Sequence, residues 1–280
     1  MSRADEYFKD QITTLKSHGF NDEDFSVRAV WPSDGAPAHT IKTFSYVTRY
    51  DLSKEFPIQT LRKQSFKNAI KETLWIFQKR STNINDLGLH IWDAWADKHG
   101  DLGKTYAHAL KEEIDYPEGK FNQVDYLLYQ LKNNPMDRRM MLQLFDPHNV
   151  KHTKLPPCVM TYLFDVSNGR LNMTVIQRSG DVLAAAAAGG WDEIGMAVLQ
   201  HMLAQVSGLR VGELVHVVNN LHIYDRHMEH VGKILFNEEY DAPEFTINKD
   251  IKDFYDFTVD DFKLENYKAT SLDIKFEVAV

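Results

Sequence analysis

The segment 155–181 is LPPCVMTYLFDVSNGRLNMTVIQRSGD, and it carries the clearest indication of the fold. β-forming residues dominate 157–167 and 171–178, and the Ser-Asn-Gly sequence between them is typical of a turn, so we predict two paired strands. Two prolines precede Cys158 and fix the backbone that presents its thiol. A thiolate nucleophile needs a lowered pKa, and Arg178 at the end of the second strand is the natural guanidinium to supply it.

Helices and strands alternate irregularly on both sides of this segment. Apolar spacing predicts helices at 3–18, 63–80, 123–132, 191–207 and 226–237. Further strands are predicted at 39–50, 139–145, 212–219 and in the last ten residues, whereas 21–40 and 82–120 are expected to be irregular. This order lacks regular βαβ alternation, so we predict an α+β fold in which helices flank one large mixed or mostly antiparallel sheet. Residues 1–280 are predicted to form a single catalytic domain.

The composition of the chain is that of an ordinary globular protein. It has 280 residues and a formal net charge of -8, which argues against broad binding to nucleic acid. No apolar run approaches the roughly 18 residues of a membrane span, and the N-terminus lacks the apolar segment of a signal peptide. We expect a cytoplasmic protein that acts on a small anionic substrate. No metal site, nucleic-acid partner or membrane partner is predicted.

Each candidate residue also has an explanation that involves no function. Cys158 is the only cysteine, so it forms no internal disulfide, and a lone cysteine is more often buried filler than a nucleophile. Arg138 and Arg139 suit bidentate recognition of a phosphate, but they could equally be a solvated strand end. His222 could be a core histidine, and Glu72 could lie on the polar face of its helix. The combination and order of these residues therefore carry more weight than any one of them.

Seven motifs in sequence order resemble the thymidylate synthase family over nearly the whole chain, and the similarity is greatest to a bacillus-type branch. They are 71–75 (KETLW), 91–96 (IWDAWA) with 100–106 (GDLGKTY), 134–139 (NPMDRR), 155–158 (LPPC), 177–181 (QRSGD), 222–227 (HIYDRH), and 253–257 (DFYDF) with 278–280 (VAV). The resemblance implies a homodimer whose sheets pack back to back, with 5,10-methylenetetrahydrofolate as co-substrate. It also implies that Cys158 attacks C6 of a pyrimidine deoxynucleotide 5′-monophosphate, after which a one-carbon unit is built at C5.

The same resemblance implies a role for each matching residue. Proton transfer would fall to Glu72, with an ordered water and Tyr106. The substrate phosphate would be held by Arg28, Arg178 and Ser179 of one chain and by Arg138 and Arg139 of the other. The ribose 3′-hydroxyl would be bound by His222 and Tyr224. The folate would be positioned, and the site closed, by Trp92, Trp95, Asp181 and the carboxylate of Val280.

The chain departs from the family between Asp181 and the helix at 191–207. The family normally has an asparagine at the start of this helix, where it recognises the pyrimidine edge. If about three residues are inserted in the loop, Asp192 takes the asparagine position, whereas an alignment without a gap puts Gly189 there. We prefer the insertion because loops absorb extra residues more easily than a buried helix does. The alternative for Asp192 is that it only caps the helix, where aspartate is favoured.

An aspartate at this position favours cytosine. Uracil offers an N3–H donor and an O4 acceptor, while cytosine offers an N3 acceptor and an N4 amino donor. A carboxylate accepts from the amino group, and one shared proton completes the pair with N3. Phage-type dCMP hydroxymethylases within the family show the same exchange. The leading hypothesis is therefore hydroxymethylation of dCMP, with Asp192 as a catalytic and substrate-binding residue.

Three alternatives stay open from the sequence. The chain could convert dUMP to dTMP, or it could hydroxymethylate dUMP. Trp92 and the Ala-Val terminus favour hydride transfer to the one-carbon unit, while Ala107 and the rebuilt loop favour altered access of water, so these features conflict. A catalytically silent relative that only binds nucleotide or RNA is the third alternative, and the intact set of Cys158, Glu72, Arg178 and His222 weighs against it.

Overall fold

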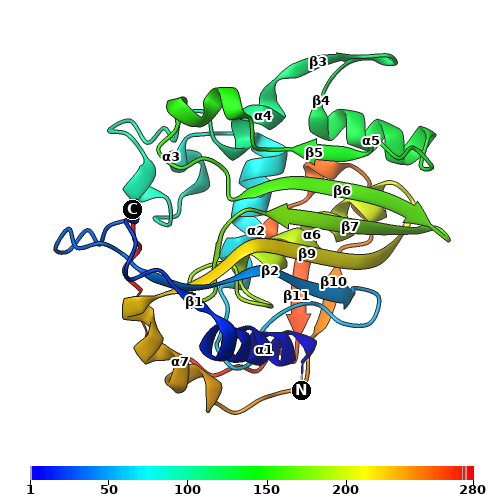
Figure 1. The fold of residues 1–280 in the computed structure, drawn as a ribbon. Helices are drawn as coiled ribbons and strands as arrows, with labels where there is room; N and C mark the ends of the chain where they lie inside the picture. The colour runs from blue at the N-terminus through cyan, green and yellow to red at the C-terminus, as the bar shows by residue number, and fades with distance from the viewer. Residues whose placement is uncertain (1, 273, 275) are drawn as a thin grey trace.

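A seven-stranded mixed sheet forms the centre of the protein in the computed structural model, which describes residues 2–272, 274 and 276–280 (Figure 1). The strand order is β1-β2-β9-β7-β6-β5, and β8 pairs with the end of β9. Neighbouring strands are antiparallel except where β7 and β8 run parallel to β9. The strands of this sheet are β1 (Phe20–Asn21), β2 (Thr40–Asp51), β5 (Met141–Gln143), β6 (Val159–Ser167), β7 (Arg170–Gln177), β8 (Gly180–Asp181) and β9 (Arg210–Tyr224).

Two small hairpins and seven α-helices complete the described secondary structure, together with short 3-10 turns and one π-helical turn. The hairpins pair β3 (Glu113–Tyr116) with β4 (Gly119–Asn122), and β10 (Glu244–Ile247) with β11 (Phe262–Glu265). The helices are α1 (Arg3–His18), α2 (Phe66–Leu74), α3 (Ile84–Leu87), α4 (Tyr106–Lys111), α5 (Gln123–Asn133), α6 (Trp191–Val206) and α7 (Met228–Leu235). None of the helices in the described residues is long and apolar enough to cross a membrane.

Helices α2 and α6 cover one face of the sheet, behind the strands in Figure 1. Burial alternates along β7, which is the pattern of a strand with only one face in the core. Helix α6 is apolar on nearly all sides, because it lies between the sheet and α2. The front face of the sheet in Figure 1 carries no helix, and apolar side chains such as Leu163 and Val47 remain 42% and 45% exposed on β6 and β2.

Helices α1 and α7 pack at the lower edge of the sheet in Figure 1, around a second apolar cluster. This cluster joins Phe8 and Ile12 of α1 to Val231 of α7 and to residues of the 182–188 segment. The cluster anchors the 182–188 segment, which belongs to the loop where the sequence departs from the family that it resembles.

The predicted fold class is confirmed, and most elements lie where the sequence places them. The helix at 3–18 has the predicted bounds, and the strand at 212–219 is longer, since β9 runs on to Tyr224. The irregular segment 82–120 contains α3, α4 and a hairpin that the sequence did not predict.

One prediction, β-rich structure in the last ten residues, is wrong for the described part of that segment. Positions 273 and 275 lie outside the described residues, and no strand forms among the others. Leu272, Ile274 and Phe276 pack against the second apolar cluster, so the alternating pattern reflects an extended segment with one face buried and no ladder partner. At the end of the segment, the backbones of Val280 and Val30 exchange two hydrogen bonds, with N···O distances of 2.9 and 3.0 Å.

Candidate active site

Cys158 lies immediately before β6, and Arg178 lies immediately after the paired strand β7. The backbone N–H of Arg178 donates to the Cys158 carbonyl at 2.8 Å, so the hairpin brings the two residues together. The guanidinium donates to the carbonyls of Pro156 and Pro157 at 2.7 and 3.0 Å, and its Nη2 lies 3.6 Å from the Cys158 Sγ. The hydroxyl of Tyr106 accepts the Cys158 N–H at 2.8 Å. The two prolines therefore restrict the backbone, and their carbonyls also accept the hydrogen bonds that orient Arg178.

The electrostatic prediction for this thiol is only partly right. Burial raises the pKa of Cys158, and the nearby Asp192 carboxylate raises it further. Arg178, Tyr106 and Arg28 act in the opposite direction but do not outweigh burial. The sequence predicted the lowering effect of Arg178 and missed the burial, so the free site holds Cys158 as a thiol.

The carboxylate of Glu72 accepts hydrogen bonds from two tryptophans. The indole N–H of Trp92 donates to Oε1 and that of Trp191 donates to Oε2, each at 2.6 Å. Burial raises the pKa of Glu72 to about 7, against these two hydrogen bonds, which lower it, while Asp192 adds to the rise. A carboxyl group with a pKa near neutrality can exchange a proton with a substrate at ordinary pH. Trp92 also packs edge-on against Trp95 and Tyr106, with ring centroids 5.7 Å apart in each pair.

Asp192 is in the first turn of α6 and faces the same site. Its Oδ2 accepts a hydrogen bond from Gln177 Nε2 at 3.0 Å. Burial raises the pKa of Asp192, and its charge in turn raises the pKa values of Cys158, Glu72 and Tyr106. The residue at the helix N-cap is Gly190, and it makes no side-chain capping bond. Asp192 therefore lies beside the cysteine, and the Asp192 side chain does not cap the helix.

The segment 182–190 folds inward and makes specific contacts. Val182, Leu183 and Ala186–Ala188 are buried, and Ala188 accepts from Gln59 Nε2 at 2.7 Å and donates to Gln11 at 2.9 Å. Gly189 has a φ of +63°, and a Cβ there would lie 2.4 Å from Ala4. Only glycine fits this position without displacing the backbone. The loop is a fixed support for the start of α6.

Asp181, His222 and Tyr224 lie together on the adjacent strands β8 and β9, where Asp181 is the register partner of His222. Burial opposes ionisation of Asp181, but His227 at 3.6 Å and the Leu183 N–H at 2.9 Å hold its pKa below the ordinary value. Burial lowers the pKa of His222, so the ring is neutral at pH 7. Burial raises the pKa of Tyr224 to about 12, so its hydroxyl keeps its proton. The neutral imidazole of His222 and the neutral hydroxyl of Tyr224 thus lie beside the ionised carboxylate of Asp181.

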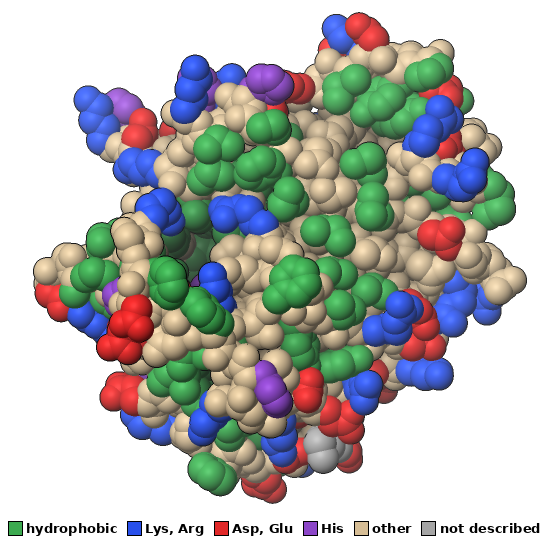
Figure 2. Space-filling model, viewed as in Figure 1, with side chains coloured by type: hydrophobic (Ala, Val, Ile, Leu, Met, Phe, Trp, Pro, Cys, Tyr) green, Lys and Arg blue, Asp and Glu red, His purple; other side chains and the backbone are tan. Residues whose placement is uncertain are grey.

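The C-terminus lies at the rim of this site. Val280 pairs with the backbone of Val30, two residues after Arg28, and the charge of Arg28 acts on both Cys158 and Tyr224. Figure 2 shows a hollow on this face, near the C-terminus, with Lys and Arg side chains at its edge. The Ser179 carbonyl accepts a hydrogen bond from Gln177 Nε2 at 3.0 Å, and this bond links Ser179 to Gln177.

Arg138 and Arg139 are the predicted site residues that the single chain does not bring to Cys158. Both are exposed in the turn between α5 and β5. Arg139 forms a bidentate pair with Asp137 at 2.6 and 2.9 Å, and the acidic neighbours of this turn include Glu118 but no residue of the cysteine site. Trp95, by contrast, lies within the cluster through Trp92.

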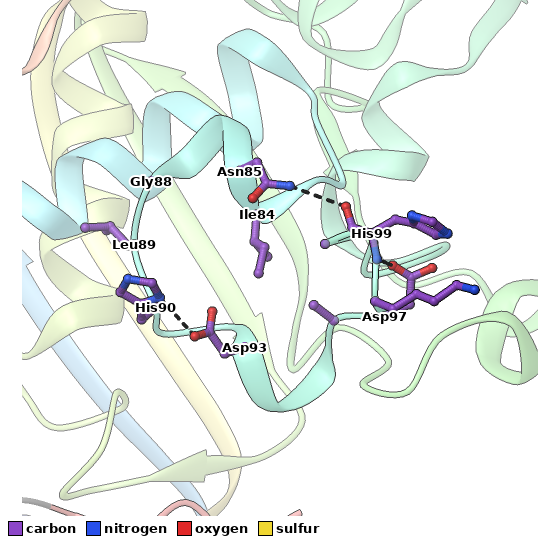
Figure 3. Close-up of a pocket in the computed structure, with 11 residues that line it drawn as sticks. Ile84, Asn85, Gly88, Leu89, His90, Asp93, Asp97 and His99 are labelled. Atoms are coloured by element: carbon purple, nitrogen blue, oxygen red, sulfur yellow. Dashed lines mark hydrogen bonds and ion pairs between the residues drawn. The ribbon is translucent and has the colours of Figure 1, made fainter.

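A separate cavity of about 540 Å³ lies within the segment 84–100 (Figure 3). It is lined by residues of 84–100, including Asn85, His90 and Asp97, and His90 pairs with Asp93 at 2.9 Å. It contains neither Cys158 nor Glu72, so it is not the catalytic pocket.

Sequence reasoning missed Trp191 and gave no role to Gln177, Glu193 or His216. Trp191 is separated from Glu72 by 119 positions, so no local pattern predicts their hydrogen bond. Its place beside Asp192 in the divergent segment was the available signal.

The geometry agrees with what comparison to known proteins finds. The family model described as thymidylate synthase matches residues 6–280. The chain is 42% identical over 284 residues to thymidylate synthase 1 of Bacillus subtilis strain 168 and to the thymidylate synthase of Bacillus phage phi3T, with all of each chain covered. The solved structure of thermostable thymidylate synthase A from Bacillus subtilis is similar over the full length of both chains, with a TM-score of 0.92 and 41% identity. The chain is therefore a one-carbon transferase that belongs to the thymidylate synthase family.

Proposed function

We propose that this enzyme transfers the one-carbon unit of 5,10-methylenetetrahydrofolate to C5 of dCMP. The observation that carries the choice of nucleotide is Asp192, a carboxylic acid held beside the cysteine where the family has an asparagine. Its raised pKa suits it to share one proton with N3 of cytosine while it accepts from the N4 amino group. Burial makes a mismatch costly, since an unpaired donor or acceptor loses about 1–3 kcal/mol.

In the proposed mechanism the thiol of Cys158 loses its proton and its sulfur adds to C6, which places an electron pair on C5. Bound folate supplies the electrophilic carbon for C5, and Trp92 and Trp95 offer it an apolar wall with two partly exposed rings. Glu72, acting through water, takes the proton from C5, and Tyr106 keeps a protonated hydroxyl next to the Cys158 backbone. After the C5 proton has left, the bond between the transferred carbon and the folate nitrogen breaks with its electron pair on nitrogen, and tetrahydrofolate is released. Water, or hydride from the tetrahydrofolate, adds to the transferred carbon. The C6–S bond then breaks, its electron pair returns to sulfur, and Cys158 is released.

Binding of the nucleotide and the folate divides among three groups of residues. Arg28, Arg178 and Ser179 hold the phosphate, and His222 and Tyr224 bind the ribose 3′-hydroxyl. Asp181 and the Val280 carboxylate position the folate and close the site. The support for these roles is the clustering of Asp181, His222 and Tyr224 on β8 and β9, together with the charge of Arg28 that acts on both Tyr224 and Cys158.

We assign the remaining phosphate ligands, Arg138 and Arg139, to the second chain of a homodimer. They are exposed and remote from Cys158, and the front face of the sheet is open, with Leu163 and Val47 partly exposed. A back-to-back dimer through this face buries the apolar side chains and lets each turn at 134–139 reach its neighbour's site. A single domain over 1–280 and a cytoplasmic location complete the proposal.

Conversion of dUMP to dTMP is the second candidate, and the comparisons favour it over hydroxymethylation of dCMP. The named relatives are thymidylate synthases, with 42% identity over the full length of the chain. Asp192 bears on the base and not on the fate of the transferred carbon. Hydroxymethylation therefore stays a prediction from the sequence.

Release of tritium from C5-labelled dCMP and dUMP in the presence of 5,10-methylenetetrahydrofolate separates the candidates. We expect release from dCMP and little from dUMP, because the Asp192 carboxylate accepts from the N4 amino group of cytosine, whereas O4 of uracil offers it no donor. Product mass then distinguishes capture of the one-carbon unit by water from reduction to a methyl group. Release from dUMP alone would overturn the cytosine proposal and support the second candidate.

A further prediction concerns the hydrogen bond that Trp191 donates to Glu72. Turnover is expected to fall as the pH falls through about 7, because a protonated Glu72 cannot accept the C5 proton. The Trp191 indole stabilises the ionised carboxylate, so Trp191→Phe should move this decline upward by roughly half to one pH unit. The measurement is kcat against pH for the nucleotide that the enzyme accepts.

Two variants control this experiment. Trp75→Phe also removes an indole hydrogen bond, the one to the Asn83 carbonyl at 3.1 Å, but does not touch Glu72, and it should leave the midpoint in place. Glu72→Gln should flatten the profile and lower kcat by about 10²–10³-fold. A Trp191→Phe profile that coincides with that of the Trp75→Phe enzyme would show that the indole does not tune Glu72.

A further inference from the structure

A chain of buried polar residues lies directly behind Asp192. Glu193, His216 and Gln177 are 0%, 1% and 3% exposed. The Nδ1 of His216 lies 3.1 Å from Glu193 Oε1, and its Nε2 lies 2.7 Å from Gln177 Oε1. Gln177 Nε2 in turn donates to Asp192 Oδ2 at 3.0 Å. We call Glu193, His216 and Gln177 the buried network.

The hydrogen-bonding direction of this network is determined at the Gln177 end. The Ser179 carbonyl can only accept, so the atom of Gln177 that faces it, at 3.0 Å, must be the amide nitrogen. The Gln177 oxygen therefore faces His216, whose Nε2 must carry a proton. Gln177 then presents an N–H, and never an acceptor, to Asp192.

At the other end, three groups meet on one carboxylate. The Gly189 N–H donates to Glu193 Oε2 at 2.6 Å, while the Thr48 hydroxyl donates to Oε1 and the His216 Nδ1 lies 3.1 Å from the same oxygen. These contacts hold the Glu193 side chain and the His216 ring in one orientation. A charge on His216 acts on Asp192 against the effect of burial.

We propose that Glu193 and His216 are positioning residues that fix the orientation and hydrogen-bonding direction of Asp192, and thereby set its discrimination between cytosine and uracil. The step rests on the proposed role of Asp192 in base recognition. Because the Gln177 N–H occupies Oδ2, rotation of the carboxyl group is restrained and the proton shared with the base has a defined place. Without the network, Asp192 could turn and present either oxygen, protonated or not, to either base edge.

Several ionisable groups surround Asp192 and contribute to its titration. The groups that interact electrostatically with it are Glu72 on α2, Tyr106 on α4, Cys158 and Tyr162 at β6, Glu193 on α6, and His216 on β9. Among these, His216 is the group that acts to lower the pKa of Asp192. Its removal should therefore keep Asp192 protonated to higher pH.

Binding of dCMP and dUMP to the full-length enzyme, measured by titration calorimetry from pH 6 to 9, tests the proposal without requiring turnover. The variants are His216→Phe, which removes both ring nitrogens, and Glu193→Gln, which keeps the shape of the side chain. The ratio of the two dissociation constants should move toward one by about tenfold or more in each variant. In His216→Phe the loss of dCMP binding with rising pH should also shift upward.

Gln200→Met is the matched control. Gln200 is on the same helix, is fully buried, and donates to the carbonyls of Leu171 and Glu213 at 2.8 and 3.0 Å, but it has no link to Asp192. We expect it to lose stability and to keep the wild-type ratio. If His216→Phe does not fold, the isosteric Glu193→Gln variant decides alone.

The outcomes separate this inference from the proposed function. A wild-type enzyme that binds dUMP more tightly would overturn the cytosine proposal. The buried network would still stand if the ratio then moved toward one in the variants. Ratios in Glu193→Gln and His216→Phe that equal those of wild type and Gln200→Met would overturn the positioning role, whichever nucleotide wild type prefers.

Discussion

Replacement of Cys158 with alanine is expected to abolish turnover, by about 10⁴-fold or more in kcat, while nucleotide binding persists. The thiolate is the only group at the site that can add to C6, and without that addition C5 stays too poor a nucleophile to form a bond. The side chain is small and partly accessible, so its loss opens little space in the core. The measurement is single-turnover release of C5 tritium together with calorimetric binding of the nucleotide.

The same experiment tests the silent-relative alternative. A protein that only binds nucleotide would retain all its measurable function in Cys158→Ala. Serine at position 158 is a useful second variant, because it keeps the shape and still lacks an effective nucleophile. Tritium release at the wild-type rate from either variant would exclude Cys158 as the attacking group.

Cys158→Ala also reveals whether the site is shared between two chains. If Arg138 and Arg139 serve the neighbouring chain, a dimer that joins Cys158→Ala to an Arg138→Ala, Arg139→Ala chain contains one complete site. Equal mixing with free exchange should then restore about a quarter of wild-type activity from two inactive proteins. Mixtures that stay inactive although the chains exchange would show that these arginines act in their own chain or not at all.

The sequence predicted the elements whose pattern is local. Helix α1 follows from apolar spacing and its Gly19 stop, and the β6–β7 pair follows from β-formers around a turn. Cys158 and Arg178 flank that pair, so their proximity follows from the same local pattern. The sequence did not predict the hairpin β10–β11. Its strands have four residues each, which is too short for periodicity to show, and 14 residues separate them.

The candidate site was predictable in its members but not in its connections. Glu72 and Cys158 matched family motifs, yet the indole of Trp191 on Glu72 and the approach of His216 to Gln177 join positions that are far apart in the chain. Burial decides the pKa of Cys158, and burial depends on the packing of the inserted loop and α6. Those quantities arise from tertiary structure, so residue type and spacing alone cannot supply them.

Replacement of Asp192 with asparagine is expected to exchange the preferred nucleotide. An amide offers a fixed donor and a fixed acceptor, which match N3–H and O4 of uracil and oppose N3 and the N4 amino group of cytosine. Gln177 should determine the orientation, because its N–H selects the rotamer of the new side chain whose oxygen faces it. Two mismatched hydrogen bonds at about 1–3 kcal/mol each predict a loss of about 10²–10⁴-fold in kcat/KM for dCMP, with a gain for dUMP.

The measurement that tests this prediction is kcat/KM for both nucleotides in wild type and in Asp192→Asn. Asp181→Asn is the matched control, since it makes the same chemical change at a site carboxylate that faces His227 and not the base, so it should reduce the rate with both nucleotides alike. An Asp192→Asn enzyme that keeps its preference for dCMP would mean that base recognition resides elsewhere. A wild type already selective for dUMP would mean that Asp192 accepts N3–H as an ionised carboxylate. In that case the asparagine would improve dUMP only by adding the donor to O4, a gain of about tenfold and not an exchange of substrate.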